Sequence, residues 1–583
     1  MQSILVIGLG SMGNRRIRCL KYLNEKYVIY GFDTNKIRRH DAEISHKIIT
    51  YDNYDLYFKN KIDLVIISTP PDHHEIYVFD CLKKNIKFFV EAGVFNENFI
   101  KIQRFLFNNL NIGMPSSTLY FHPAISKIKN IISNNELGSI SNIIYHSGQY
   151  LPDWHTYENV SDFYVSNKKT GGAREIVPFE LTWLTKLFGF PRFIYGNCKK
   201  TINIEGAETI DDTYNVILEY NNFSINLIVD VVSRYATRKL TINGDIAQLE
   251  WSWDKDEILI KSNDNILKRS YSALPSNNKY NKNISEEMYI KEMDKFINYD
   301  IDYKCNIVNN FFREEQVIEL LNKVEKSFVD KQFQSFINVG IVINISLESK
   351  RLSLKHLKKI KEEYILEYLI KRILNKTQNI DNLKLILNVS EKSRDKYFDI
   401  LYFICKKYNI YLFFSNHSNI PKRINNCADY FGLSHIISVD GDDILVSADG
   451  ITSIFNKFNS NKYEDLVTTK GLPFGMNVMG FSKELLENSL LNDNSLILET
   501  GWGKIFNCNK TFISYNFEKI ENFNNLRLTL DYDDDFNFFK EILENVDCCS
   551  SDLDIINHII SNNLFKINEK RIKEYWDNFN KEK

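Results

Sequence analysis

The sequence has no excess of charge of either sign and no long apolar run. Its 583 residues include 73 Lys and Arg against 75 Asp and Glu, which gives a formal net charge of -2. No global field then attracts nucleic acid or an anionic membrane, so we expect no nucleic-acid partner and small-molecule ligands held in local pockets. Nowhere do about 18 apolar residues follow one another, so membrane insertion is not predicted. The first residues, MQSILVIGLG, lack the basic segment and cleavage site of a signal peptide, which predicts a cytoplasmic protein.

The sequence also lacks cysteine pairs at metal-ligand spacing. Its nine cysteines are scattered, and none of them forms a CxxC pair. The adjacent residues Cys548 and Cys549 suit no ordinary tetrahedral zinc knuckle. The simple interpretation is a reduced, cytoplasmic chain.

The length and the strand patterns predict several domains. A single hydrophobic core stops growing at about 250–300 residues, so this chain cannot form one domain. Two segments, 3–20 and 339–357, each begin with an apolar strand that leads into a loop, as α/β domains do. Strand and helix patterns alternate up to about residue 118, and longer strands after residue 140 indicate an antiparallel sheet. We therefore predict an α/β domain at 1–118, an α+β open-sheet domain at 119–335 and a second α/β domain at 336–583.

The first candidate site is a glycine-rich loop at the start of the chain. GLGSMG places Gly8, Gly10 and Gly13 in GxGxxG spacing between a strand and a helix, so the phosphates of a dinucleotide can bind at the helix N-terminus, near Ser11 and Met12. Asp33 ends the next strand about 20 residues after the last glycine, where a carboxylate binds a ribose 2′-hydroxyl. It would repel a 2′-phosphate, so NAD is favoured over NADP. Arg15 and Arg16 could weaken that preference.

Four further segments carry a family resemblance over residues 1–330: ISTPPDHH (67–74), KFFVEAG (87–93), YFHPAI (120–125) and GGAREIVPFELTWLTKLFG (171–189). They resemble the glucose–fructose oxidoreductase, inositol dehydrogenase and MocA family. The resemblance implies a Rossmann domain, then a domain whose open sheet binds a sugar or polyol over the nicotinamide and often forms dimers, so a homodimer is expected. It adds Thr69, Pro70, His73 and Glu91 to the expected cofactor-binding residues.

The sequence departs from this family where the family places its catalytic groups. Ala92 stands in place of the usual lysine, and Ile176 and Phe179 stand in place of the usual aspartate and histidine. Hydride transfer from a hydroxyl needs a general base, and none of these three side chains can act as one.

Other polar residues beside the expected cleft are candidates for that role. We expect His155 or Glu180 to do acid–base work, with Arg174 and Glu175 beside them. Three alternatives stay open: Glu180 is a structural carboxylate, His155 only bonds a loop, or the domain binds nucleotide and substrate without catalysis.

The second half places acidic and basic residues around predicted strand ends. SVDGDD (438–443) ends a strand in an acidic cluster, and LRLTLDYDDDF (526–536) puts Asp531 at the end of another strand before a helix. Mg²⁺ commonly takes one or two carboxylates together with substrate phosphates. Arg351 and Lys355 lie four residues apart, where a loop can wrap a triphosphate and neutralise its charge. Taken alone, an acidic cluster at a strand end is more often a solvated turn than a metal site.

Together with EYLIKRIL (367–374), YFGLSHIISVDGDD (430–443) and GLPFGMNVMGFSKELLE (471–487), these segments resemble the sugar cytidylyltransferases over residues 338–583. The resemblance implies a Rossmann-like, GT-A-like nucleotidyltransferase sheet, CTP and a sugar or sugar acid as substrates, and Mg²⁺ at Asp442 and Asp531. Ser346 stands in place of a usual arginine, which weakens phosphate binding. Ser353-Leu354 replaces the usual Pro-Gly.

The two resemblances together predict a bifunctional enzyme of activated-sugar biosynthesis for surface glycans or glycoproteins. An NAD-dependent sugar oxidoreductase would be fused to a CTP-dependent cytidylyltransferase. In one alternative, one or both halves only bind nucleotides. In another, the first half is a redox-neutral epimerase or lyase that retains NAD.

Overall fold

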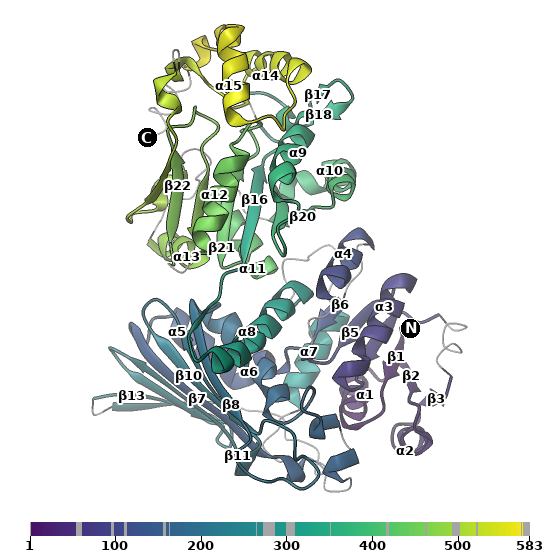
Figure 1. Cartoon of the computed structure of the whole chain (residues 1–583). Coiled ribbons are helices and arrows are strands. Elements are labelled where there is room, and N and C mark those ends of the chain that lie inside the picture. The colour runs from purple at the N-terminus through teal and green to yellow at the C-terminus, as the bar shows by residue number, and fades with distance from the viewer. Residues whose placement is uncertain are drawn as a thin grey trace. The chain divides into compact units, whose positions relative to one another are not determined.

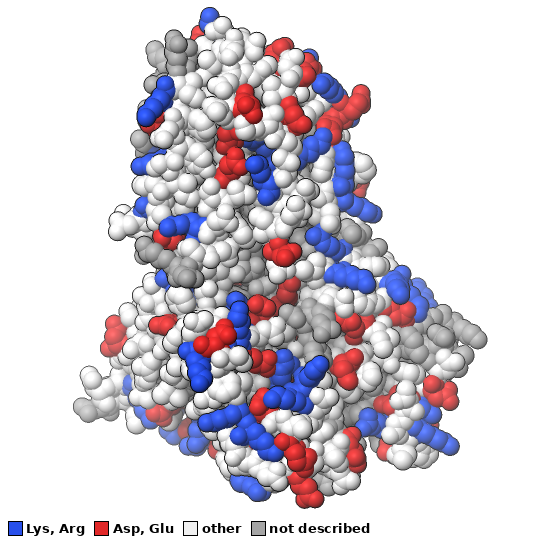
Figure 2. Space-filling view, viewed as in Figure 1, with Lys and Arg blue, Asp and Glu red and all other residues white. Residues whose placement is uncertain are grey.

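The structure is a computed structural model of the chain. It describes residues 2–53, 61–94, 98–109, 113–154, 159–162, 164–263, 265–271, 286–298, 309–349, 351–415, 419–460, 463–492, 502–520, 523–572 and 574. The chain forms two compact units, Met1–Phe336 and Ile337–Lys583. Among the described residues, no helix has the length and apolarity needed to cross a membrane. On the face drawn in Figure 2, acidic and basic side chains are interspersed.

The first unit begins with a six-stranded parallel sheet in the order β3-β2-β1-β4-β5-β6 (Figure 1). The strands are β1 (Ser3–Ile7), β2 (Val28–Phe32), β3 (Ile49–Tyr51), β4 (Leu64–Ile67), β5 (Lys87–Val90) and β6 (Gly113–Pro115). Between them lie α1 (Ser11–Leu23), α2 (Lys36–His46), η2 (Pro71–His73), α3 (His74–Lys84) and α4 (Phe99–Asn109). This is the strand order of the Rossmann fold, so the parallel sheet predicted for this part is confirmed.

A nine-stranded sheet follows in the same unit, in the order β14-β13-β12-β11-β7-β10-β9-β8-β15. Its strands are β7 (Ile140–Tyr150), β8 (Phe193–Lys199), β9 (Thr213–Glu219), β10 (Ser224–Asp230), β11 (Val232–Gly244), β12 (Gln248–Ser252), β13 (Glu257–Ser262), β14 (Asn265–Ser270) and β15 (Gln334–Ser335). The expectation of a purely antiparallel sheet is wrong in one place, because β7 and β10 pair in parallel. The sheet is therefore mixed.

Further helices of this unit are η3 (Thr118–Phe121), α5 (Pro123–Ser133), α6 (Ala173–Phe188), α7 (Glu287–Ile297) and α8 (Phe311–Asp330). Of these, α5, α6 and α8 contact the mixed sheet, whereas α7 packs mainly against α1 and η3. Helices α6 and α8 pack against each other, and α6 contacts β9 and β10 while α8 contacts β8. Buried and more exposed residues alternate along β9, as in a sheet with one covered face. The division of this unit at residue 118 stays a prediction.

The second unit contains a seven-stranded sheet in the order β20-β19-β16-β21-β23-β22-β24. Its strands are β16 (Val339–Ile345), β19 (Lys384–Ser390), β20 (Tyr411–Ser415), β21 (His435–Asp440), β22 (Leu466–Lys470), β23 (Met479–Ser482) and β24 (Thr511–Ser514). Strand β23 is antiparallel to both its neighbours, and the other pairings are parallel. The result is a third, mostly parallel α/β sheet.

The helices of this unit are η8 (Lys355–Leu357), α9 (Ile365–Thr377), α10 (Arg394–Tyr408), α11 (Ile420–Phe431), α12 (Ala448–Phe458), α13 (Lys483–Asn492), α14 (Asp533–Asn545) and α15 (Asp552–Ser561). A two-stranded ribbon, β17 (Lys359–Ile360) and β18 (Glu363–Tyr364), precedes α9. The strand expected at 526–531 is not formed; only an isolated bridge joins Phe474 and Arg527. Asp531 nevertheless lies just before α14, as expected.

Candidate functional site

The three glycines of the loop between β1 and α1 have different surroundings. Gly8 has a φ of +86°, and a Cβ there would lie 2.6 Å from the carbonyl oxygen of Ser68. A Cβ on Gly13 would lie 1.8 Å from the carbonyl oxygen of Gly8, so neither position tolerates a side chain. Among the described residues, a Cβ on Gly10 would meet only a guanidinium nitrogen of Arg38, at 3.8 Å. Gly8 and Gly13 therefore serve the fold, whereas Gly10 leaves open space at the start of α1.

The first turn of α1 borders this open space. Ser11 and Met12 begin the helix, and its N-cap, Gly10, offers no side chain to bond the first N–H groups. The amide of Asn14 donates to the carbonyl oxygens of Leu9 at 2.7 Å and Gly10 at 2.9 Å, which fixes the loop. A helix start held in this way favours a phosphate group.

Asp33 directly follows β2 and is fixed by backbone groups. One carboxylate oxygen accepts the N–H of Leu9 at 2.8 Å, and the other accepts the N–H of Asn35 at 2.8 Å. Each oxygen keeps a second lone pair with which it can accept a hydroxyl. Arg39 donates to the backbone carbonyl of Asp33 at 2.7 Å, so its side chain lies beside the same loop.

Arg15 and Arg16 do not lie where the sequence placed them. Both are buried, and Arg16 pairs with Glu91 at 2.7 Å and with Glu292 at 2.8 Å. The expectation that these two arginines moderate the nucleotide preference is therefore wrong. Glu91, which was predicted to bind the cofactor, is paired with Arg16, so its carboxylate is engaged within the protein.

Thr69 and Pro70 follow β4 at the edge from which the glycine loop also leaves. The carbonyl oxygen of Thr69 accepts a hydrogen bond from His74 at 2.8 Å. Within the part of the chain that the structure describes, the buried hydroxyl of Thr69 has no partner. His73 is exposed at the end of η2. The Thr69 hydroxyl is the polar atom of this segment that a ligand could satisfy.

Glu180 lies in the interior of the first unit. Its oxygens accept hydrogen bonds from Tyr145 at 2.7 Å, Ser147 at 2.8 Å, Trp183 at 2.9 Å and Arg238 at 2.9 Å. The residue is 0 % exposed, and each of its oxygens already accepts two hydrogen bonds, so neither oxygen is left to take a proton from a substrate. Of the two interpretations of Glu180, this geometry favours the structural carboxylate.

The other residues considered for acid–base work differ in the contacts that hold their side chains. Arg174 is held by Glu325 at 2.7 Å and by the carbonyl oxygen of Val94 at 3.2 Å. His155 lies outside the described residues. Ile176 and Phe179, which the sequence resemblance aligned with an aspartate and a histidine, pack against the hydrophobic core.

Glu175 is the candidate whose surroundings suit proton transfer. Tyr164 donates to one oxygen of its carboxyl group, and the other oxygen is buried without a partner among the described residues. Burial raises the pKa of Glu175 to about 7, although the hydrogen bond from Tyr164 lowers it. Burial and the Glu175 charge raise the pKa of Tyr164 well above its ordinary value. A carboxyl group that titrates near neutral pH can both accept and release a proton.

In the second unit, the loops after β16 and β21 leave the third sheet side by side, because these strands are parallel neighbours. The chain continues from β16 to β19 on one side and later returns to β21 on the other. Ligands of open α/β sheets bind at such a switch point, beyond the carboxyl ends of the strands. These two loops carry Arg351, Lys355 and Asp442.

Lys355 is the centre of a charged cluster at this edge. Its ammonium group is ion-paired with Asp442 and lies 3.1 Å from Asp531. His356 Nε2 lies 2.8 Å from the other oxygen of Asp442, and Arg351 lies 3.1 Å from Asp531. The structure thus brings together the four residues that the sequence assigned to phosphate and metal binding. The ammonium group of Lys355 thus already lies between the carboxylates of Asp442 and Asp531.

The carboxyl groups of this cluster differ in proton affinity. Asp440 is exposed at the end of β21, yet the surrounding protein and the charge of Asp442 raise its pKa to about 6. Burial, reinforced by Asp440 and Asp442, raises the pKa of Asp443 well above its usual range. Burial opposes ionisation of Asp442 too, but Lys355 and His356 hold its pKa below its usual range. The cluster therefore combines two carboxyl groups that hold a proton more tightly than usual with one, Asp442, whose basic neighbours favour its ionised form.

Three residues of these sites were not singled out from the sequence. Tyr164 and His356 gave no signal beyond being polar. Arg527 is 1 % exposed, donates to Asp531 at 2.9 Å and pairs with Asp535. Only its spacing of four residues from Asp531 could have indicated this contact.

Comparisons with known proteins bear on the first unit. Residues 2–94 match the model of the GFO_IDH_MocA oxidoreductase family with an NAD-binding Rossmann fold. No curated protein matches the chain. Levoglucosan dehydrogenase in complex with NADH and L-sorbose is 14% identical with a TM-score of 0.49, over 57% of this chain and 98% of that one. A myo-inositol dehydrogenase from Corynebacterium glutamicum is 15% identical with a TM-score of 0.45, over 58% of this chain and 99% of that one.

Proposed function

We propose that the first unit is an NAD-dependent oxidoreductase that acts on a sugar or sugar acid. The open space beside Gly10 is a cradle that a Cβ would fill, and it fits the close approach of a pyrophosphate. The match of residues 2–94 to an NAD-binding family model supports the same ligand. Bound NAD would supply the hydride acceptor. Asp33 would accept a ribose hydroxyl and disfavour a 2′-phosphate, so NAD is proposed over NADP.

Glu175 is the proposed general base. When a hydroxyl is oxidised, its proton has to leave together with the hydride, and a base with a pKa near the working pH does this best. Tyr164 would hold one oxygen of Glu175 and leave the other to take the proton. Glu175 would thereby supply the function that Ala92 and Phe179 cannot.

Titration of the full chain with NADH tests the nucleotide site. In Gly10→Ala the new Cβ meets open space, so we expect unchanged thermal stability and loss of NADH binding. Wild-type affinity in this variant would contradict the proposal.

Turnover of a sugar and sugar-acid panel with NAD tests the general base. We expect a wild-type rate that rises with pH through about 7, and a rate that is lost in Glu175→Gln while NADH binding is retained. Activity in the variant with the wild-type pH profile would exclude Glu175 as the base.

We propose further that the second unit is a Mg²⁺-dependent cytidylyltransferase that joins a sugar or sugar acid to CMP. The observation that carries this proposal is that Asp442 and Asp531 both contact the ammonium group of Lys355, at the switch point of the third sheet. These oxygen donors fit Mg²⁺: Asp442 and Asp531 would hold the ion, which would supply positive charge to stabilise the triphosphate during nucleotidyl transfer. Arg351, which is 40% exposed at its side chain, and Lys355 would then neutralise the triphosphate.

Pyrophosphate release from CTP in the presence of the same panel tests this second activity. We expect Mg²⁺-dependent release that is lost in Asp442→Asn and in Lys355→Met. Asp533→Asn is the matched control, because Asp533 is 78% exposed and pairs with Lys358 outside the cluster. Silence of the wild type across the panel, or equal effects of all three variants, would contradict the assignment.

Nucleotide binding without catalysis is the second candidate for the first unit. It is favoured by the apolar packing of Ile176 and Phe179 at positions where the family has catalytic groups. NADH binding without turnover of any sugar, in a chain that still releases pyrophosphate, would support it.

A further inference from the structure

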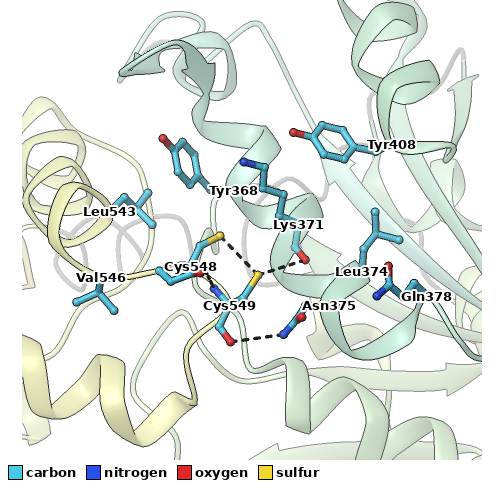
Figure 3. Close-up of a pocket in the computed structure, with 11 residues that line it drawn as sticks. Tyr368, Lys371, Leu374, Asn375, Gln378, Tyr408, Leu543, Val546, Cys548 and Cys549 are labelled. Carbon is cyan, nitrogen blue, oxygen red and sulfur yellow. Dashed lines mark hydrogen bonds between the residues drawn. The ribbon is translucent and has the colours of Figure 1, made fainter.

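The turn between α14 and α15 places two thiols and a carboxylate together. Asp547, Cys548 and Cys549 each offer one ligand atom, and these atoms all lie within 4.8 Å of one another. The turn borders a surface pocket of about 450 Å³, whose other walls include Tyr368, Lys371 and Tyr408 (Figure 3). We infer that these three residues bind a thiophilic divalent cation of the Zn²⁺ class, with its remaining coordination position open to the pocket. This inference is independent of both proposed activities.

The distance between the two sulfur atoms suits a shared metal ion. The Sγ atoms of Cys548 and Cys549 are 3.9 Å apart. Two bonds of about 2.3 Å at a tetrahedral angle separate the sulfur atoms of a zinc dithiolate by about 3.8 Å. A disulfide would need a separation of about 2.05 Å. The two sulfur atoms therefore already lie at the separation that two thiolate ligands of one zinc ion have.

The backbone of the turn is held in place by neighbours in α9. Arg372 donates to the carbonyl oxygen of Cys548 at 2.6 Å and to that of Ser550 at 2.9 Å. The N–H of Cys549 donates to the Asp547 carboxylate at 2.8 Å, which turns this carboxylate toward the thiols. Figure 3 shows both sulfur atoms on the side of the turn that faces Lys371. Because these contacts position the ligands before any ion binds, little ordering is left to oppose binding.

The site differs from the zinc knuckle that the sequence excluded. A knuckle supplies four protein ligands from two separated pairs, whereas this turn supplies three from consecutive residues. Three protein ligands and one open position are the arrangement of zinc sites that bind water or a small molecule. The pocket leaves room for that fourth ligand.

Titration of the chelator-treated full chain with Co²⁺ tests the inference, because cobalt reports thiolate ligands by charge-transfer absorption. We expect this absorption to saturate at one Co²⁺ per chain and to be displaced by Zn²⁺. It should be lost in Cys548→Ser and Cys549→Ser, and weakened in Asp547→Asn. Cys508→Ser is the matched control, since Cys508 is exposed and lies outside the turn. Asp442→Asn should also keep the absorption, because the carboxylate cluster would bind cobalt through oxygen alone.

Circular dichroism of the serine variants separates loss of the ligands from loss of the fold. Absence of the charge-transfer absorption in the wild type would overturn the inference. So would its survival in both serine variants, or its loss in Cys508→Ser.

Discussion

Replacing Glu175 with glutamine is expected to stabilise the first unit at alkaline pH and to leave it unchanged at acid pH. Burial raises the pKa of Glu175 from its ordinary value of 4.5 to about 7. The folded state therefore holds the proton more tightly than the unfolded chain does. The associated stability is fully present below about pH 4.5 and is lost as the pH rises through about 7.

The expected gain follows from this difference in pKa. A difference of about 2.5 at about 1.4 kcal/mol per pKa unit costs the folded wild type about 3 kcal/mol at pH 8. Glutamine keeps the shape of the side chain and can still accept the hydrogen bond from Tyr164, but it carries no charge to bury. Its free energy of unfolding should therefore exceed that of the wild type by up to about 3 kcal/mol at pH 8.

Urea denaturation between pH 5 and pH 8.5 measures this gain. Tryptophan fluorescence reports the relevant unit because Trp183 and Trp251 are buried in its core. Glu205→Gln is the matched control, since Glu205 is exposed in the same unit and its replacement should leave the pH dependence unchanged. The reasoning would be refuted if Glu175→Gln shifted stability equally at every pH, or if it destabilised the unit at pH 8.

Three further substitutions have expected outcomes. Gly13→Ala places a Cβ 1.8 Å from a backbone oxygen of Gly8, so we expect more than about 4 kcal/mol of destabilisation in thermal melts and no NADH binding in titration calorimetry. Glu180→Gln removes the counter-charge of buried Arg238 and should cost about 3–5 kcal/mol in urea denaturation. Arg372→Met breaks a buried ion pair in the second unit, and scanning calorimetry should show about 3 kcal/mol of destabilisation with unchanged NADH affinity. A melt like that of the wild type would contradict each of these expectations.

Features that depend on residues adjacent in the chain could be predicted from the sequence. The GxGxxG spacing after an apolar strand predicted the turn now seen at Gly8 and the helix that starts at Ser11. The strand at 435–440, which ends in the acidic cluster, was recognisable because it is a short apolar run. Such patterns predict backbone structure that residues close together in the chain determine.

The segment 526–530 shows where this reasoning fails. Its alternation predicted a strand, and Leu526, Leu528 and Leu530 are indeed buried. However, the N–H of Leu528 donates to Phe474 at 2.8 Å and that of Leu530 donates to Asp442 at 2.9 Å, so the bonds go to loops. Alternation indicates which side chains are buried, but it does not show whether a neighbouring strand exists.

The role of Glu180 could not be predicted for a related reason. Its hydrogen-bond donors come from β7, β11 and its own helix, up to 58 residues away. Nothing in the local sequence indicates that they meet there. From the sequence, Glu180 could only be placed near the expected substrate cleft. The packing of its helix on the sheet shows that its carboxylate is buried away from that cleft.

The ammonium group between Asp442 and Asp531 has a thermodynamic consequence for the proposed nucleotidyl transfer. A divalent cation that binds these carboxylates must first displace Lys355. With no triphosphate present, the displaced ammonium loses its acceptors, and this cost opposes metal binding. Once the triphosphate is bound, its oxygens can receive the ammonium, so metal and nucleotide strengthen each other's affinity by an equal factor. The lysine would thus make the two ligands cooperative without any movement of the fold.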